Sequence, residues 1–151
     1  MTNDKPARRR KLIWIIVAIA IVIIAVVSSI IYVMNQPATA PAPPSGPNVI
    51  IWNGSLCNSA SNCGYSPSSR NVTSGTTITW TNNGNPHTVT TCDSSHFSSM
   101  GCPVQDAAGL DTFDSGTIAN GGAFSHTFVV KGTYYYYCTL HLWMRGEVIV
   151  N

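Results

Sequence analysis

The segment that decides the fold is Cys138-Thr-Leu-His-Leu-Trp-Met144, near the end of a chain of 151 residues. It places Cys138, His141 and Met144 at positions i, i+3 and i+6, close enough for the three side chains to converge on one point. Earlier in the chain, the segment Asn-Pro-His-Thr-Val-Thr at residues 85–90 supplies one more imidazole, His87. Packing in a core would explain any one of these residues alone. The four together, in this order and spacing, predict a metal site.

These four side chains offer one thiolate, two imidazoles and one thioether. That is the donor set of type 1, or blue, copper sites, in which two histidines and a cysteine bind in a plane and a methionine binds weakly on the axis. Sulfur donors favour Cu(I), whereas imidazole also suits Cu(II). A mixed set therefore holds both oxidation states with little rearrangement, which suits one-electron transfer. We expect His87, Cys138, His141 and Met144 to bind one copper ion.

Residues 48–151 have the pattern of an all-β domain. Large apolar and small polar side chains alternate in several short runs, and Gly- and Asn-rich clusters separate the runs, which is typical of a β-sandwich. His87 would then lie on a strand, and the other three candidate ligands on a short loop between the last two strands. We expect strands near residues 49–52, 76–81, 87–91, 123–130, 133–138 and 147–150.

The run from Thr133 to Val150 resembles the C-terminal copper loop of the cupredoxins, the family of type 1 blue copper proteins. Its Cys-x-x-His-x-x-Met spacing resembles the short loop of amicyanin, whereas plastocyanins usually space the histidine and the methionine further apart. The domain as a whole most resembles amicyanin and plastocyanin-like domains. Residues 75–83 and 86–90 resemble the strand pair that carries the first histidine ligand of this family. The resemblance implies a Greek-key β-sandwich with one mononuclear copper and a role as an electron carrier. Leu140 and Leu142 depart from the amicyanin pattern, which has proline at both positions, so the family's redox potential should not be carried over.

Three segments precede this domain. Residues 1–11 are basic, with a net charge of +4. Leu12 to Met34 is an apolar run of 23 residues, long enough at ~1.5 Å per residue to cross a hydrocarbon core of about 30 Å. Residues 35–47 hold five of the nine prolines and predict a semi-rigid linker. The positive-inside rule keeps residues 1–11 in the cytoplasm and places the copper domain outside, on a single-pass transmembrane helix of the cell membrane.

A cleaved signal peptide is the alternative to a retained anchor. Ala38-Thr-Ala40 fits a small-residue cleavage pattern, although the apolar run is longer than the usual core of ~7–15 residues. Both interpretations place the domain outside the cytoplasm, in a periplasm or on the outer cell surface. There, Asn53 and Asn71 match N-glycosylation acceptors. From Asn48 onward the net charge is −2, so the domain lacks the basic patch with which proteins bind nucleic acid.

The chain has five cysteines, and an odd number in an exported protein needs an explanation for the unpaired one. Metal binding by Cys138 supplies that explanation. The other four cysteines allow three pairings. We favour Cys57–Cys63 and Cys92–Cys102, because each pair brackets a short loop rich in Ser, Asn or Gly.

The donor set points to a carrier rather than an enzyme. The chain has four histidines, and the two that remain beside the proposed ligands are too few for a trinuclear or type 2 copper centre. A single cysteine in the ligand segment also argues against a binuclear site. We expect a monomeric, membrane-anchored protein that carries single electrons between membrane-associated redox proteins. The alternative is a copper chaperone or scavenger that delivers copper to an extracytoplasmic oxidase, although four ligands set into a sandwich favour retention of the ion.

Overall fold

The structure is a computed structural model of the whole chain. It describes residues 5–34, 39–42, 46–54, 56–94, 97, 102 and 109–151. The chain divides into two units, residues 1–36 and 37–151. Residues 35–38 and 43–45 of the expected proline-rich linker lie outside the described residues.

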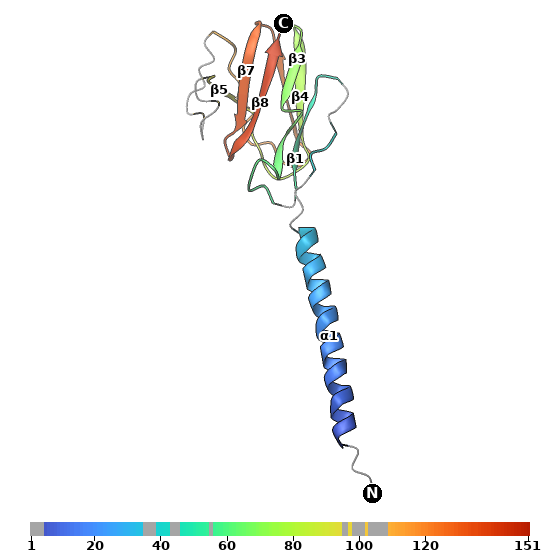
Figure 1. Cartoon of the computed structure of the whole chain (residues 1–151). Coiled ribbons are helices and arrows are strands. Elements are labelled where there is room, and N and C mark those ends of the chain that lie inside the picture. The colour runs from blue at the N-terminus through green and yellow to red at the C-terminus, as the bar shows by residue number, and fades with distance from the viewer. Residues whose placement is uncertain are drawn as a thin grey trace. The chain divides into compact units, whose positions relative to one another are not determined.

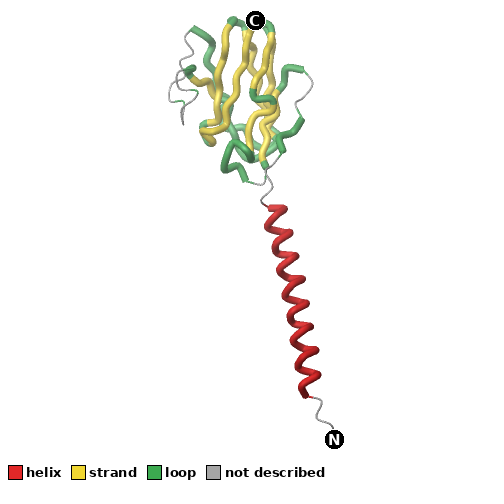
Figure 2. The backbone as a smooth tube through the Cα atoms, viewed as in Figure 1, coloured by secondary structure: helices red, strands yellow, loops and turns green. Residues whose placement is uncertain are grey.

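The first unit contains the helix α1, Lys5–Met34 (Figure 2). It begins within the basic segment rather than at Leu12, because lysine, alanine and arginine are good helix formers. From Arg9 to Met34 its side chains are exposed. This stretch is long and apolar enough to cross a membrane, and a signal sequence near an N-terminus would have the same properties.

The second unit is a sandwich of two four-stranded sheets (Figure 1). One sheet has the order β2-β1-β4-β6 and the other the order β3-β8-β7-β5. Both are mixed, because β1 runs parallel to β4 and β3 runs parallel to β8. This confirms the expected Greek-key sandwich. The strands are β1 Val49–Asn53, β2 Cys63–Ser66, β3 Ser69–Val72, β4 Thr76–Asn82, β5 Thr90–Cys92, β6 Ala123–Phe128, β7 Gly132–Cys138 and β8 His141–Val150.

An aromatic core joins the two sheets. Trp80 on β4 is fully buried, and its ring packs against Phe113, Phe124, Phe128 and Tyr136 with centroid distances of 5.3–6.2 Å. Burial of such large rings supplies much of the hydrophobic stabilisation of a small sandwich. The core thereby fixes β7 against the opposite sheet.

Strand alternation decides which side of β7 meets this core. Tyr134, Tyr136 and Cys138 belong to the main core cluster, whereas Tyr135 and Tyr137 pack on the other face. Successive side chains of a strand point to opposite faces, as the sequence pattern predicted. Cys138 therefore lies inside the sandwich, with 0% of its surface exposed.

Two disulfides confirm the favoured pairing. Cys57 is bonded to Cys63, and Cys92 is bonded to Cys102. The fifth cysteine, Cys138, is free and buried. The only cysteine left as a thiol is thus the one in the candidate ligand segment.

The close packing of Gly146 on β8 against Tyr136 can be tested by substitution. A Cβ atom there would overlap the ring end of Tyr136, which is fully buried between Trp80 and Tyr65 and has no room to move. We expect Gly146→Ala to lower the free energy of unfolding by roughly 1–3 kcal/mol, as overpacking does. Urea denaturation of the full chain in detergent measures this.

Gly64→Ala is the matched control, because its Cβ would meet Trp52 Nε1 at 3.4 Å, an ordinary contact. Its free energy of unfolding should change by less than about 1 kcal/mol. Equal effects of the two substitutions would contradict the packing assigned to Tyr136.

Candidate metal centre

The β7–β8 hairpin carries Cys138, His141 and Met144. Cys138 ends β7, a two-residue turn follows, and His141 begins β8 paired with Cys138. The neighbouring pair is Tyr137 with Arg145, so residues 142–144 are extra on β8 and form a bulge. The sequence predicted a loop here, but the short turn lets pairing resume at once and leaves the extra residues inside the strand. Bulges of this kind re-aim side chains next to functional sites.

His87 enters the site from the turn that follows β4. The side-chain amide of Asn82, a fully buried residue, donates to the carbonyls of Asn85 and Ile118, both at 2.8 Å. His87 and Ile118 then exchange two backbone hydrogen bonds of 3.2 and 2.7 Å. The expected strand begins only at Thr90, so His87 is a fully buried bridge residue just before it.

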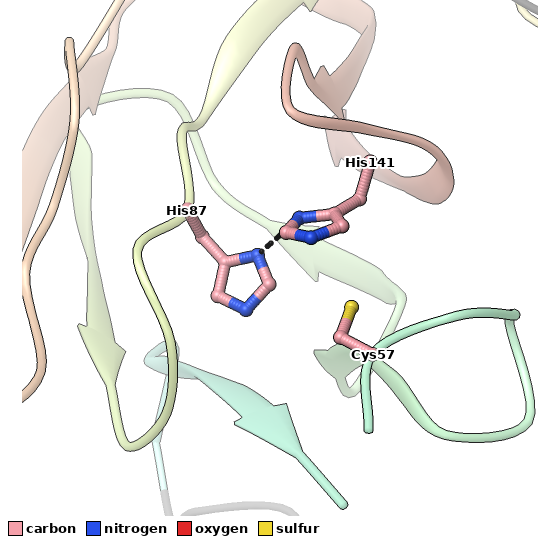
Figure 3. A group of neighbouring side chains, drawn as sticks. All are labelled: Cys57, His87 and His141. Atoms are coloured by element: carbon pink, nitrogen blue, oxygen red, sulfur yellow. Dashed lines mark hydrogen bonds between the residues drawn. The ribbon is translucent and has the colours of Figure 1, made fainter.

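Three donor atoms from these two segments form a closed triangle. His87 Nδ1 and His141 Nδ1 are 3.1 Å apart, and each lies 3.6 Å from Cys138 Sγ. Figure 3 shows the two imidazoles, from different segments, turned toward each other. The point equidistant from the three atoms lies about 2.0 Å from each, close to the distances at which imidazole and thiolate bind a metal ion such as zinc. The triangle therefore has the size of a single metal site.

The thioether of Met144 is buried beside the Cys57–Cys63 disulfide, which borders the triangle. Met144 is 1% exposed, and its Sδ is 3.9 Å from Cys57 Sγ. Cys57 Sγ in turn lies within 4.8 Å of a ring nitrogen of His87 and of His141 (Figure 3). Cys57 is part of a disulfide and carries no thiolate, so Cys138 is the available thiolate donor. The sequence pattern did not predict that Cys57 lies beside the site.

Comparison with known proteins identifies the fold and its chemistry. The family described as copper binding proteins, plastocyanin/azurin family, matches residues 55–151. The chain belongs to this family. It is similar to the structure of a purple cupredoxin from Nitrosopumilus maritimus, with 31% identity over 70% of this chain and all of that one, at a TM-score of 0.57. It is also similar to an oxidised variant of amicyanin, with 25% identity over 76% of this chain and 95% of that one, at a TM-score of 0.50. None of the proteins with curated descriptions matches it.

The donors of this cupredoxin domain fit one copper ion. Burial, with His141 next to it, lowers the pKa of His87 to about 4, and burial also lowers the pKa of His141. Both rings are therefore neutral at pH 7, and a ring nitrogen of each can bind a metal. Neutral imidazoles beside a thiolate and a thioether are the donors that blue-copper sites use.

Asn53, at the end of β1, sets the tautomer of His87. Its Oδ1 accepts a hydrogen bond from His87 Nε2–H, which leaves the Nδ1 lone pair directed at the triangle. A Cβ at Gly84 would overlap the Asn53 side chain, so the glycine leaves room for it. Asn53 Nδ2 is buried, which leaves no space for the glycan that the sequence motif suggested. Sequence reasoning missed this role because Asn53 and His87 are far apart in the chain.

Thr88 ties the two ligand segments together. Its backbone N–H donates to Cys138 Sγ at 3.3 Å, and its hydroxyl oxygen accepts the N–H of Thr139 at 2.8 Å. The two threonine hydroxyls also lie 3.2 Å apart. Contacts of this kind orient metal ligands, and a hydrogen bond to the cysteine sulfur tunes the redox potential of a copper site.

Removing the acceptor of Asn53 should release His87. In Asn53→Ala the buried Nε2–H loses its partner, so we expect the metal-free protein to lose the fixed Nε2–H tautomer of His87. Nitrogen-15 NMR of the imidazole measures this. Copper affinity should fall by roughly 10–100-fold, as for other residues that orient a metal ligand.

Asn53→Asp keeps an oxygen at the same position and serves as the control. It should retain the Nε2–H tautomer. A wild-type-like His87 spectrum in Asn53→Ala would show that Asn53 does not fix the ring.

Proposed function

We propose that His87, Cys138, His141 and Met144 bind one copper ion and that the domain carries single electrons. The closed triangle of His87, His141 and Cys138 donor atoms carries this proposal. A copper ion bound there would supply a Cu(I)/Cu(II) couple. The donors lie on a paired hairpin and on a segment bridged to Ile118, so little nuclear rearrangement would oppose a change of oxidation state.

Burial supports electron transfer over copper delivery. Cys138, His87 and Met144 are exposed by 0%, 0% and 1%, so an acceptor protein could not reach them to exchange ligands. A chaperone needs donors that a partner can approach. Only His141 among the four proposed ligands is half-buried rather than buried. The arrangement favours an ion that stays while electrons pass.

The edge of His141 is the best exit for the electron. Leu140, in the adjoining turn, is 51% exposed, and the Trp143 ring lies 5.5 Å from the His141 ring. Leu142 and Trp143, which follow His141, are half-buried against the two core clusters. Leu140 is therefore the main apolar contact that a partner would meet. A small apolar contact suits the weak, brief complexes of redox partners.

The helix α1 supports a tether to a membrane. With the basic residues before it on the cytoplasmic side, the copper domain would face outward. Its partners would then be membrane-associated redox proteins on the same face, and the tether would raise their local concentration without strong binding. Residues 1–11 would form the basic tail, 12–34 the anchor, 35–47 the linker and 48–151 the copper domain.

Cys138 is the first residue to test. The full chain in detergent, loaded with Cu(II), should show an intense visible thiolate-to-copper absorption, and Cys138→Ala should abolish it because the only free thiol is gone. Circular dichroism checks that the β domain stays folded. Met144→Leu is the control, since it keeps the thiolate and should keep an intense visible band with an altered redox potential. A band that survives in Cys138→Ala would refute the assignment.

Electron transfer through the edge of His141 can be tested with a matched pair of lysine substitutions. Leu140→Lys should slow electron self-exchange by roughly tenfold or more, because two like charges would meet as two copies approach. Val129→Lys adds the same charge at a residue that is 59% exposed and precedes β7, at the other end of that strand. Its rate should stay close to that of the wild type.

Nuclear magnetic resonance of mixed oxidised and reduced protein measures the exchange rate, and the visible spectrum verifies an intact site. Equal rates in the two variants would place the exit elsewhere.

A further inference from the structure

The Cys57–Cys63 disulfide lies against the proposed copper ligands. Cys57 Sγ is 3.9 Å from Met144 Sδ and within 4.8 Å of a ring nitrogen of both histidines. Figure 3 shows Cys57 on a loop beside the two imidazoles. A sulfur atom outside the proposed ligand set is thus already about one donor–donor distance from the site.

The two halves of this disulfide are held differently. Cys63 begins β2, is 1% exposed and pairs with Asn53. Its Sγ accepts the indole N–H of Trp143 at 3.4 Å and lies 3.6 Å from the carbonyl oxygen of Ser59. Cys57 is half-buried on the segment between β1 and β2. If the bond opened, Cys63 would stay on its strand with an acceptor for its S–H, and Cys57 would be free to shift toward the triangle.

We propose that reduction of this disulfide creates a second metal site, in which Cys57 replaces Met144 beside His87, Cys138 and His141. This inference rests on the proposed ligand set of the copper site. Two thiolates and two imidazoles form the Cys2His2 set, which binds Zn(II) in tetrahedral geometry. A charged thiolate in place of a neutral thioether favours this closed-shell ion over the His2CysMet copper centre. The reduced protein would then hold zinc instead of a redox-active ion.

The reductant is a dithiol of the extracytoplasmic compartment. Its two sulfurs become a disulfide, and the Cys57–Cys63 bond breaks. Two electrons and two protons pass to the pair and give two thiols. The Cys57 thiol gives its proton to solvent when its sulfur binds the metal.

Two single substitutions distinguish binding of metal by the Cys57 thiol from the mere loss of the disulfide. Cys63→Ser and Cys57→Ser both remove the same bond, but only Cys63→Ser leaves a thiol at position 57. The full chain is purified in detergent without metal, kept anaerobic with a phosphine reductant, and titrated with Co(II) and then with Zn(II). Circular dichroism confirms that each variant is folded.

We expect Cys63→Ser to show about twice the thiolate-to-Co(II) charge-transfer absorption of Cys57→Ser, because two thiolates bind instead of one. Its Zn(II) affinity, measured by competition with a chelator, should be at least about tenfold higher. Equal absorption and equal affinity would overturn the proposal. Unfolding of both variants would also overturn it, because a reduced chain that cannot fold cannot form the site.

Oxidised wild-type protein loaded with Cu(II) keeps the two proposals distinguishable. An intense visible band in the wild type, together with identical Co(II) and Zn(II) behaviour of the two variants, would refute the second site alone. Absence of that band in the wild type would refute the copper site on which it rests.

Discussion

The bulged end of the β7–β8 hairpin is the constraint on which the site depends. In a regular strand, His141 and Met144 would point to opposite faces, because they are three residues apart. The extra residues 142–144 break this alternation, and regular burial of every second residue begins at Met144. The bulge therefore keeps His141 paired with Cys138 and still turns the side chain of Met144 into the sandwich.

The rest of the domain holds this hairpin end rigid. The aromatic core around Trp80 fixes the face of β7 that carries Cys138. Thr88 links Cys138 to the segment of His87, and Asn53 holds the His87 ring from the opposite sheet. Both sheets thus help to hold one triangle of donors. A site built in this way resists changes of geometry, which is what transfer of a single electron requires and what release of an ion would not.

Much of this could be predicted from the sequence, because ligand types and spacing are local. The alternation along Tyr134–Cys138 and both disulfide pairs follow from short-range patterns and are confirmed. The set of four candidate ligands follows from the same kind of pattern and stays a prediction. The strands β2 and β3, four residues each, have no such pattern and were missed. The roles of Asn53 and Cys57 depend on how β1 and the segment after it lie against His87, which only the tertiary fold determines.

The position of the Cys57–Cys63 disulfide bears on the choice of metal. A site with three strong donors in a triangle is one donor short of the tetrahedral set that zinc prefers. While the disulfide is closed, two kinds of sulfur lie beside the site: that of Met144, which is neutral and binds weakly, and that of the disulfide, which carries no charge. Closure of this bond therefore withholds the fourth charged or strongly basic ligand from zinc while it leaves the trigonal arrangement that copper accepts. Selectivity between metals is often achieved by denying a competitor its geometry, because zinc and copper both bind imidazole and thiolate well. The same bond that braces the segment between β1 and β2 would in this way also decide which ion the domain holds.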